Sequence, residues 1–261
     1  MTTPTTDPPL IDTTTILSLL STLAILLTAY ATSLRLLPAS APPKIRALFI
    51  WHAFDALIHF LLEGSFLYNC FFASTPISTS TSIGPSPHLP PNVHFLARPG
   101  RRYGAEFGRG PSAALWREYA RADARWAGTD LTVVSLELLT VFVAGPVAVG
   151  VCEGLRRGGE GVWVWIVGLA VGELYGGFMT FMPEWLSGSP NLNTSNFMYT
   201  WVLPGIALQG ARKLTASSWV YLFFFNTLWV WIPLWILYEA YGHITTALNE
   251  QKARRSAEKN A

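Results

Sequence analysis

Apolar stretches of bilayer-spanning length constrain the fold of this 261-residue chain more than any other feature of its sequence. A transmembrane helix needs about 20 largely apolar residues. Stretches of that length run over Thr15–Leu37, Ala47–Ala73, Leu131–Glu153, Val162–Glu184 and Ser217–Tyr241. Because they are continuous rather than alternating, they do not suit a β-barrel. The sequence therefore predicts an all-α integral membrane protein, a bundle of five transmembrane helices.

The composition supports a membrane protein and excludes several other classes. Hydrophobic residues make up 51% of the chain and charged residues 13%, whereas a soluble domain has about 25% charged residues. The formal net charge is +2, with no basic stripe, so no nucleic-acid partner is expected. The two cysteines have no metal-site spacing, and we expect neither a metal nor a cofactor.

Composition also divides the chain into segments. Residues 1–14 are rich in Thr and Pro and are expected to be disordered, and residues 15–241 form one membrane domain. Within that domain, residues 74–111 are a low-complexity Ser/Thr/Pro loop, predicted to be irregular or disordered. Ser112–Asp130 has the pattern of an amphipathic helix, and residues 242–261 form a polar tail.

Basic residues in short segments predict the orientation in the membrane, because short basic loops stay in the cytoplasm. Lys44 and Arg46, then Arg156 and Arg157, and the basic C-terminal tail would lie on the cytoplasmic side. Five spans then place the N-terminus in the lumen or outside the cell. The loop 185–216 would be lumenal, and its sequon at Asn193 is either a glycosylation site or an unmodified triplet.

One stretch, WHAFDALIHFLLEG from Trp51 to Gly64, carries a polar stripe inside an apolar run. Steps of three, four and four residues put four ionisable side chains on one face of a helix. These are His52, Asp55, His59 and Glu63. Ionisable groups in a membrane helix usually face the bundle interior or a cavity. These four residues are therefore candidates for a functional site.

Other predicted spans carry polar groups at similar depth. Counted from the lumenal end of each span, Glu63, Glu173 and Asn226 lie at roughly 13 to 16 Å. Glu137 lies at roughly 9 Å and His59 at roughly 21 Å. Four spans therefore offer polar groups to one depth band, which predicts a single intramembrane pocket.

The residue types in this band suit acid–base chemistry. Two carboxylates and a histidine provide a proton donor and acceptor in one place, and the indole face of Trp229 can stabilise a cation. Such a set suits a reaction through a carbocation on an apolar substrate, or the binding of a lipophilic amine. Structural readings stay open: His59 and Glu63 as a helix-stabilising pair, Asn226 as a helix–helix contact, Trp229 as a lipid-facing residue.

Five motifs, in order along the chain, resemble those of one family. IHFLLEG carries His59 and Glu63, and LWREYARADARW carries Tyr119, Asp123 and Arg125. GTDLTVVSLELLTVFVAGP, VGELYGGFMTFMPE and FFFNTLWVWIP follow. Together they are similar to the emopamil-binding protein family of sterol Δ8–Δ7 isomerases, which carry the EXPERA domain. The resemblance covers about three quarters of the chain, from the second span onward.

The resemblance implies a multi-pass enzyme of the endoplasmic-reticulum membrane that moves a sterol ring double bond from Δ8 to Δ7. It assigns proton transfer to His59 and Glu137, assisted by Glu63, and cation stabilisation to Trp229. The remaining assigned residues orient the carboxylates, form the lumenal rim or bind substrate. They are Asn226 and Thr140, then Tyr119, Asp123 and Arg125, then Glu173 and Tyr175. His52 and Asp55 lie outside the family pattern and are expected to have local or accessory roles.

The resemblance and the residues together suggest partners and rival functions. The expected partners are a sterol substrate, membrane lipid and lipophilic amines as inhibitors, and a homodimer is compatible with the small and aromatic residues of the last span. One rival is a non-catalytic EXPERA protein, similar to the sigma-2 receptor, that binds sterols or amines. Another is a proton-coupled transporter. The long 74–111 segment and Glu173, where the family has glutamine, leave the substrate open.

Overall fold

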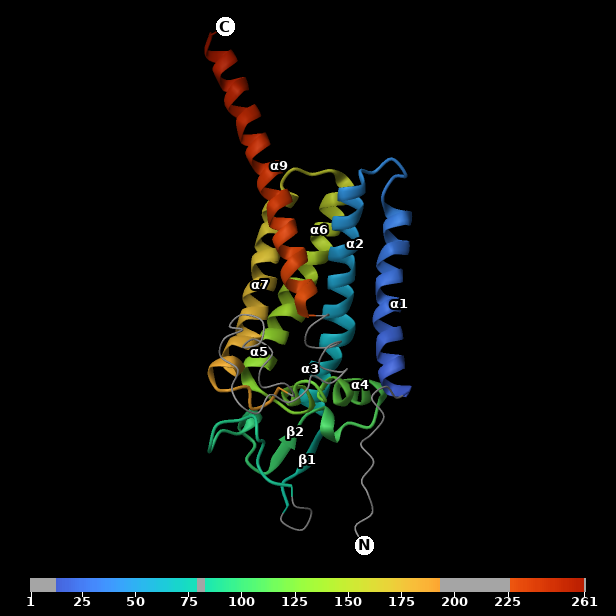
Figure 1. Ribbon diagram of the computed structural model, residues 1–261, viewed down its shortest axis with the longest axis vertical. Helices are drawn as coiled ribbons and strands as arrows, with labels where there is room; N and C mark the ends of the chain where they lie inside the picture. The colour runs from blue at the N-terminus through green and yellow to red at the C-terminus, as the bar shows by residue number, and fades with distance from the viewer. Residues whose placement is uncertain (1–12, 79–82, 193–225, 261) are drawn as a thin grey trace, which may run out of the picture.

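Long upright helices packed side by side, with a small irregular cap at one end, make up the molecule (Figure 1). The computed structural model describes residues 13–78, 83–192 and 226–260, without the side chains of Asn226 and Asn260. Four helical spans among these residues have the length and composition to cross a membrane: Thr13–Leu36, Pro43–Phe72, Leu131–Arg157 and Val162–Leu186. The prediction of an all-α, multi-pass membrane protein is confirmed at this level.

Two of the four spans are interrupted by a π-helical turn. The second span consists of α2 (Pro43–Leu57), the π-helix η1 (Ile58–Glu63) and α3 (Gly64–Phe72). The third consists of α5 (Leu131–Leu139), the π-helix η6 (Thr140–Ala144) and α6 (Gly145–Arg157). The first span is α1 (Thr13–Leu36) and the fourth is α7 (Val162–Leu186). Helix α1 begins at Thr13, so the expected disordered segment 1–14 reaches too far by two residues.

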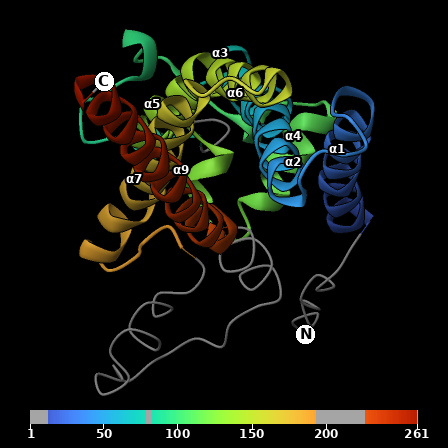
Figure 2. The ribbon, with the colours of Figure 1, turned by 90° about the horizontal axis from the view of Figure 1, so that it is seen from above.

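The fifth predicted span, Ser217–Tyr241, lies partly outside the described residues. Its described part, residues 226–241, is the N-terminal part of helix α9 (Asn226–Asn260). Helix α9 runs beside α7 (Figures 1 and 2). Helix α9 continues through Gly242 into the polar tail, because residues 247–259 are mostly strong helix formers such as Ala, Leu, Glu, Lys and Arg. A fifth membrane crossing stays a prediction. The polar C-terminal tail is helical through residue 260.

The basic segments used to predict orientation lie at one end of the bundle. The α1–α2 and α6–α7 connections and the C-terminal half of α9 are all at the upper end (Figure 1). There, Lys44 Nζ lies 2.8 Å from Glu239 Oε1, which joins the start of α2 to α9. This is the end that the positive-inside rule predicts to be cytoplasmic.

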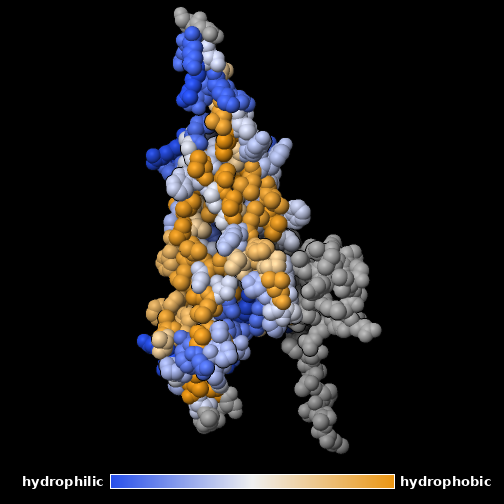
Figure 3. Space-filling model, turned by 90° about the vertical axis from the view of Figure 1, so that its left-hand side faces the viewer, coloured by the Kyte–Doolittle hydropathy of each residue, from blue (hydrophilic) through white to orange (hydrophobic). Residues whose placement is uncertain are grey.

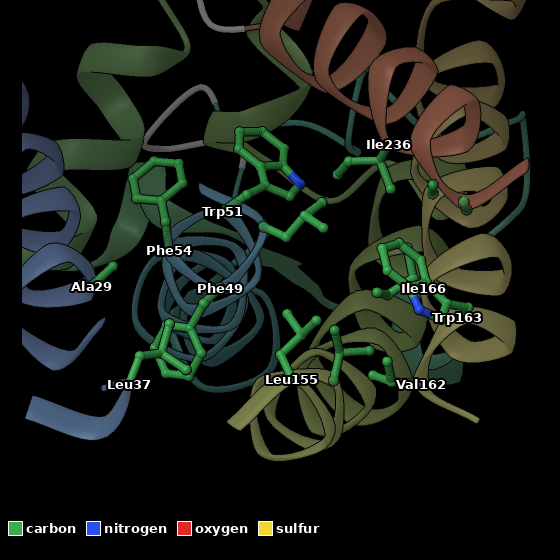
Figure 4. Packing of buried hydrophobic residues seen from close by; sticks show 14 of the residues in the cluster. Ala29, Leu37, Phe49, Trp51, Phe54, Leu155, Val162, Trp163, Ile166 and Ile236 are labelled. Atoms are coloured by element: carbon green, nitrogen blue, oxygen red, sulfur yellow. The ribbon is translucent and has the colours of Figure 1, made fainter. Parts of the chain in front are cut away.

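An apolar core joins the spans in this upper half. Phe49, Ile166 and Ile236, from α2, α7 and α9, have almost no exposed surface and belong to one cluster (Figure 4). Helix α1 lies at the edge of the bundle against α2 (Figure 2), and Leu17 on α1 is 60% exposed. Apolar side chains cover the middle of the outer surface, and polar ones its upper end (Figure 3). That belt is the surface a bilayer would cover.

The opposite end is closed by a folded cap, which corrects the expectation of disorder for residues 74–111. Strand β1 (Ser74–Pro76) pairs antiparallel with β2 (Arg101–Tyr103), and short 3-10 turns lie at Phe95–Ala97 and Ala105–Phe107. Trp116 and Trp126 stack beneath the cap with ring centroids 5.0 Å apart, and Phe66 packs on both. Low-complexity composition did not reveal this segment's fold, because only a few of its residues, such as Phe95 and Tyr103, enter the core, and aromatic residues outside the segment supply the rest.

The predicted amphipathic helix over Ser112–Asp130 is also shorter than expected. Helix α4 covers Pro111–Tyr119 only, and a separate 3-10 turn, η5, covers Ala124–Ala127. Between them Asp123 adopts an extended conformation, and its carboxylate accepts a hydrogen bond from the Arg125 backbone N–H. An aspartate that caps a following turn competes with helix continuation, which explains the break.

Gly104 lets the cap lie against the turn after η5. Its φ is +134°, and a Cβ there would lie 2.4 Å from the Ala127 carbonyl oxygen. We expect Gly104→Ala to destabilise the folded protein by about 1–3 kcal/mol, because alanine would be both strained and too large. The measurement is the apparent melting temperature of the detergent-solubilised protein.

Gly100→Ala is the matched control, since a Cβ at Gly100 meets no atom within 4 Å. Its melting temperature should stay within error of the wild-type value. Equal effects of the two substitutions would contradict this account of the cap.

Candidate active site

The two π-helical turns face each other inside the bundle and hold the polar stripe between them. Turn η1 carries His59 and Glu63, and η6 begins at Thr140, one turn after Glu137. Gly145 allows the close approach, because a Cβ there would lie 2.9 Å from the Phe60 ring and 3.4 Å from His59 Cβ. Single π-turns inside α-helices are rare and frequently occur at functional sites.

His59 lies between two carboxylates of its own helix. Its Nδ1 is 2.5 Å from Glu63 Oε2, and its Nε2 is 3.2 Å from Asp55 Oδ2. The side chain is 4% exposed, and Asp55 is fully buried. Both contacts follow from the four-residue spacing, which puts the three groups on one helix face. The imidazole is thereby held from both sides.

Asp55 also connects this helix to α9. Its Oδ1 accepts a hydrogen bond of 3.2 Å from Trp229 Nε1, across 174 positions of sequence. The Trp229 ring packs against Trp51 at 5.3 Å and Phe54 at 6.0 Å between centroids. Trp229 therefore faces the bundle rather than lipid.

Glu137 supplies the carboxyl group from the facing span. Thr140 Oγ1 donates a hydrogen bond of 2.9 Å to Glu137 Oε2. The Glu137 carboxyl group is an electrostatic neighbour of the Glu63 carboxyl group, across the contact of η1 with η6. Glu63 therefore has an imidazole in contact on one side and a second carboxyl group near it on the other.

Glu173 and Tyr175 on α7 differ in their placement. Both carboxylate oxygens of Glu173 are buried, and neither makes a hydrogen bond among the described residues. Asp55, His59 and Trp51 are its electrostatic neighbours. Tyr175 is 62% exposed. The structure therefore brings Glu173 to the His59 group and leaves Tyr175 on the outer surface.

The residues assigned to the rim form a separate ionic group at the cap. The Arg125 side chain is 2% exposed and pairs with Asp123, Nη2 to Oδ2, at 2.6 Å. It also donates to the Thr180 carbonyl oxygen at 3.0 Å. Burial raises the pKa of Asp123, and hydrogen bonds from Arg125 oppose that rise. Tyr119 packs edge-on against Trp126. These contacts tie η5 to the end of α7.

Asn226 and Asn193 cannot be assigned contacts. Asn226 is the first residue of α9, but its side chain lies outside the described residues, and Asn193 lies entirely outside them. The predicted orienting role of Asn226 and the glycosylation of Asn193 stay predictions.

The enclosed pocket also stays a prediction. The large cleft found among the described residues, of about 890 Å³, opens at the upper end against α9 rather than at His59. It is lined by charged and polar side chains, among them Lys44, Glu160 and Glu239.

The described contacts form one polar chain through the second span, the third span and α9. In order it consists of Trp229, Asp55, His59, Glu63, Glu137 and Thr140. Hydrogen bonds join Trp229 to Asp55, His59 to Glu63 and Thr140 to Glu137, and the other two links are close electrostatic contacts. Acid and base groups gathered in this way can give and take protons, while the indole offers a face to a cation. The arrangement can therefore move a proton on an apolar molecule.

Asp55, expected to have a local or accessory role, contacts two of the predicted site residues. It lies between Trp229 and His59 in the chain of contacts. The available signal was its position four residues before His59 on the polar stripe. His52 is buried as well, but neither ring nitrogen has a hydrogen-bond partner among the described residues.

A comparison with protein families decides which family these features belong to. The model of EBP, the EXPERA or expanded EBP superfamily, matches residues 111–240, about half of the chain. The chain belongs to the EBP family. The matched range contains Glu137, Glu173 and Trp229, and the span carrying Asp55 and His59 precedes it.

Three curated relatives are 24% to 26% identical to this chain over the regions that align. A probable 3-beta-hydroxysteroid-Delta(8),Delta(7)-isomerase of Arabidopsis thaliana is 26% identical over 59% of this chain and 55% of its own length. A rice protein with the same name is 24% identical over 80% of this chain and 72% of its own. The guinea-pig 3-beta-hydroxysteroid-Delta(8),Delta(7)-isomerase is 26% identical over 46% of this chain and 44% of its own. The matches thus span about half the length of most of these relatives.

His88 fastens the long loop to the end of α7. Its Nδ1 lies 3.1 Å from Asn191 Oδ1, and Asn191 Nδ2 donates to Glu184 Oε1 at 2.7 Å. Burial lowers the pKa of His88 from 6.5, although the Asn191 contact opposes this. As pH falls below about 6.5, the unfolded chain takes up a proton at this position before the folded one, so stability falls.

We expect His88→Gln to reduce this acid sensitivity, because glutamine can donate to Asn191 and does not titrate. The melting temperature of the variant should decline less than that of the wild type between pH 7 and pH 5. His94→Gln, at an exposed histidine of the same loop, is the control and should follow the wild type. Identical declines in wild type and His88→Gln would rule out a contribution from His88.

Proposed function

We propose that this protein is a sterol Δ8–Δ7 isomerase that acts inside the endoplasmic-reticulum membrane. The observation that carries the proposal is the buried contact of His59 with Asp55 and Glu63, beside Glu137 and Trp229. Membership of the EBP family and the printed names of the relatives support the same reaction. No redox change is involved, so the proposal needs no cofactor.

The reaction would proceed through a carbocation in the sterol ring system. The π electrons of the C8–C9 double bond take a proton at C9, which leaves the positive charge at C8. Loss of a proton from C7 then returns the C7–H bonding electrons to form the C7–C8 double bond. One proton is gained and one is lost, so the substrate and product are isomers.

The proposed proton-transfer groups are His59, in the π-turn η1, and Glu137, on α5 one turn before the π-turn η6. Glu63 lies between them and would pass a proton or stabilise the cation. Thr140 would hold Glu137 through its hydroxyl hydrogen bond. Which group donates and which accepts is set by where the sterol C7 and C9 atoms lie.

Other residues would bind the substrate and its cation. The Trp229 indole would face the developing charge, and Asn226, one helical turn before it, would orient a carboxylate. The buried Glu173 would add a further carboxyl group beside His59. Asp123, Arg125 and Tyr119 would maintain the cap over it. Tyr175 is left out of the proposed site, because its side chain is mostly exposed on the outer surface.

The partners follow from the same chemistry. A lipophilic amine would inhibit, because its protonated nitrogen resembles the sterol cation. The upper end of the bundle would be cytoplasmic, with its short basic loops. A homodimer would form through the outer face of α9, where Trp231 and Tyr238 are largely exposed.

One observation supports a second candidate function. The two unpaired oxygens of Glu173 could accept a hydrogen-bonded amine cation. An EXPERA protein of this kind would bind sterols or lipophilic amines without converting them. The proposed experiment separates the two functions.

The test is conversion of a Δ8-sterol by the purified full-length protein, followed by mass spectrometry of the sterol products. His59→Ala and Glu137→Gln should each lower kcat by about 100-fold or more, because a positioned proton-transfer group contributes on the order of 10² to 10⁴. Trp165→Phe, at a 62% exposed position on α7, is the control and should keep the wild-type kcat.

Unchanged turnover in both site variants would refute the proposed mechanism. Binding of sterol or amine without any conversion by the wild type would favour the second function.

A further inference from the structure

We propose that Asp55 is a positioning residue of the isomerase site. Its single carboxylate would hold the orientation of both the His59 imidazole and the Trp229 indole. The proposal rests on the proposed function and extends it to a residue outside the family motifs quoted above. The two oxygens of Asp55 have different partners: Oδ1 accepts from Trp229 Nε1, and Oδ2 faces His59 Nε2, each at 3.2 Å.

Burial makes the loss of either contact costly in free energy. Asp55 has no exposed surface and His59 has 3%, so water is not available to replace either contact. A buried polar group that loses its partner costs about 1–3 kcal/mol. The Trp229 N–H depends on Asp55 in this way. His59 Nε2 lies 3.2 Å from Asp55 Oδ2 but makes no hydrogen bond among the described residues, so its link to Asp55 is electrostatic.

The direction of the Trp229 ring depends on Asp55 in particular. Trp51 and Phe54 contact the indole at interplanar angles of 57° and 39°, which are tilted packings. Such contacts favour burial but constrain ring rotation weakly compared with a hydrogen bond of defined direction. The bond to Asp55 therefore fixes the direction of the N–H edge of the indole, and packing against Trp51 and Phe54 limits the tilt of the ring.

The orientation of His59 has two determinants on one helix. Glu63 holds Nδ1 and Asp55 holds Nε2 from the preceding turn. Loss of Asp55 would leave the ring attached through Glu63 alone and free to turn about that contact. Both ring nitrogens face carboxylates, so His59 would exchange a proton with the substrate through Glu63 or after Nε2 leaves Asp55. A ring turned out of this arrangement lowers kcat more than it lowers substrate affinity.

A negative charge at position 55 would also act on the sterol cation. Asp55 is bonded to Trp229, the residue proposed to face the cation, so its charge would act on the region where positive charge develops. Charges that stabilise the transition state more than the bound substrate raise kcat and leave KM nearly unchanged. The positioning role therefore predicts a kcat effect.

Two substitutions separate the effect of the charge of Asp55 from the effect of its hydrogen-bond acceptor. Asp55→Asn keeps an oxygen acceptor for Trp229 and removes the charge, and Asp55→Leu removes both. We expect kcat to fall about 10-fold in Asp55→Asn and about 100-fold in Asp55→Leu, with KM changed by less than about 3-fold.

Coupling between the partners is the sharper readout. If Asp55 acts through Trp229, the effect of Trp229→Phe on kcat should be at least about 5-fold smaller in the Asp55→Leu background than in the wild type. Effects that multiply independently would overturn the link between the two residues.

Asn69→Ala is the matched structural control. Asn69 is a buried polar residue of the same span, 2% exposed, and it bonds to Ser112 Oγ and the Ser65 carbonyl oxygen in the cap region. It should lower the melting temperature as the Asp55 variants do, with kcat within about 2-fold of wild type. A similar loss of kcat in Asn69→Ala would reduce Asp55 to a structural role.

Equilibrium binding gives a readout that does not require turnover. The probe is a steroid with a protonated ring nitrogen at the position of the cation, compared with its uncharged carbon analogue. Asp55→Leu should weaken binding of the cationic probe about 10-fold and leave the uncharged analogue unchanged.

The two readouts distinguish the failure of each proposal. A wild type that does not convert Δ8-sterol, but whose cationic-probe binding depends on Asp55, refutes the isomerase and retains the positioning role. Normal conversion and normal probe binding in both Asp55 variants overturns the positioning role alone. A wild type that neither converts the sterol nor binds the probe overturns both.

Discussion

The contact of one imidazole with two carboxylates is the interaction on which the rest of this membrane bundle depends. An ionisable residue at the centre of a membrane helix costs about 2.5–3.5 kcal/mol on insertion scales. The second span carries three such residues in direct contact, Asp55, His59 and Glu63. Each offsets the burial of its neighbour, so a polar stripe can exist in an apolar helix. The surrounding helices must then keep water and lipid away from it.

The architecture meets that requirement with packing on both sides of the stripe. Above it, α2, α6, α7 and α9 share an apolar core. Below it, the stacked pair Trp116 and Trp126 carries the cap. At its own level, Gly145 lets the two π-turns approach closely, which brings Glu137 to Glu63. The acid–base groups are therefore positioned by rigid helices rather than by loops, as proton transfer at a defined carbon requires.

How much of the structure the sequence could predict depends on how far apart in the sequence the interacting residues lie. Apolar run length predicted four observed spans, and the four-residue spacing predicted the contact of His59 with Glu63. The helical tail beyond Gly242 and the break at Asp123 were missed, because both depend on local preferences that hydropathy does not report. The contact of Asp55 with Trp229 was not predicted, because the two residues lie 174 positions apart. Only the fold shows that one carboxylate serves both His59 and Trp229.

Conversion of a Δ8-sterol in heavy water tests the central claim most directly. If His59 and Glu137 exchange their protons with solvent and one of them protonates the ring, the Δ7 product gains one deuterium at C9 and loses one hydrogen from C7. Mass spectrometry and deuterium NMR of the product measure this. A Δ7 product without deuterium at C9, or no Δ7 product at all, would contradict a protonated ring as the intermediate of this site.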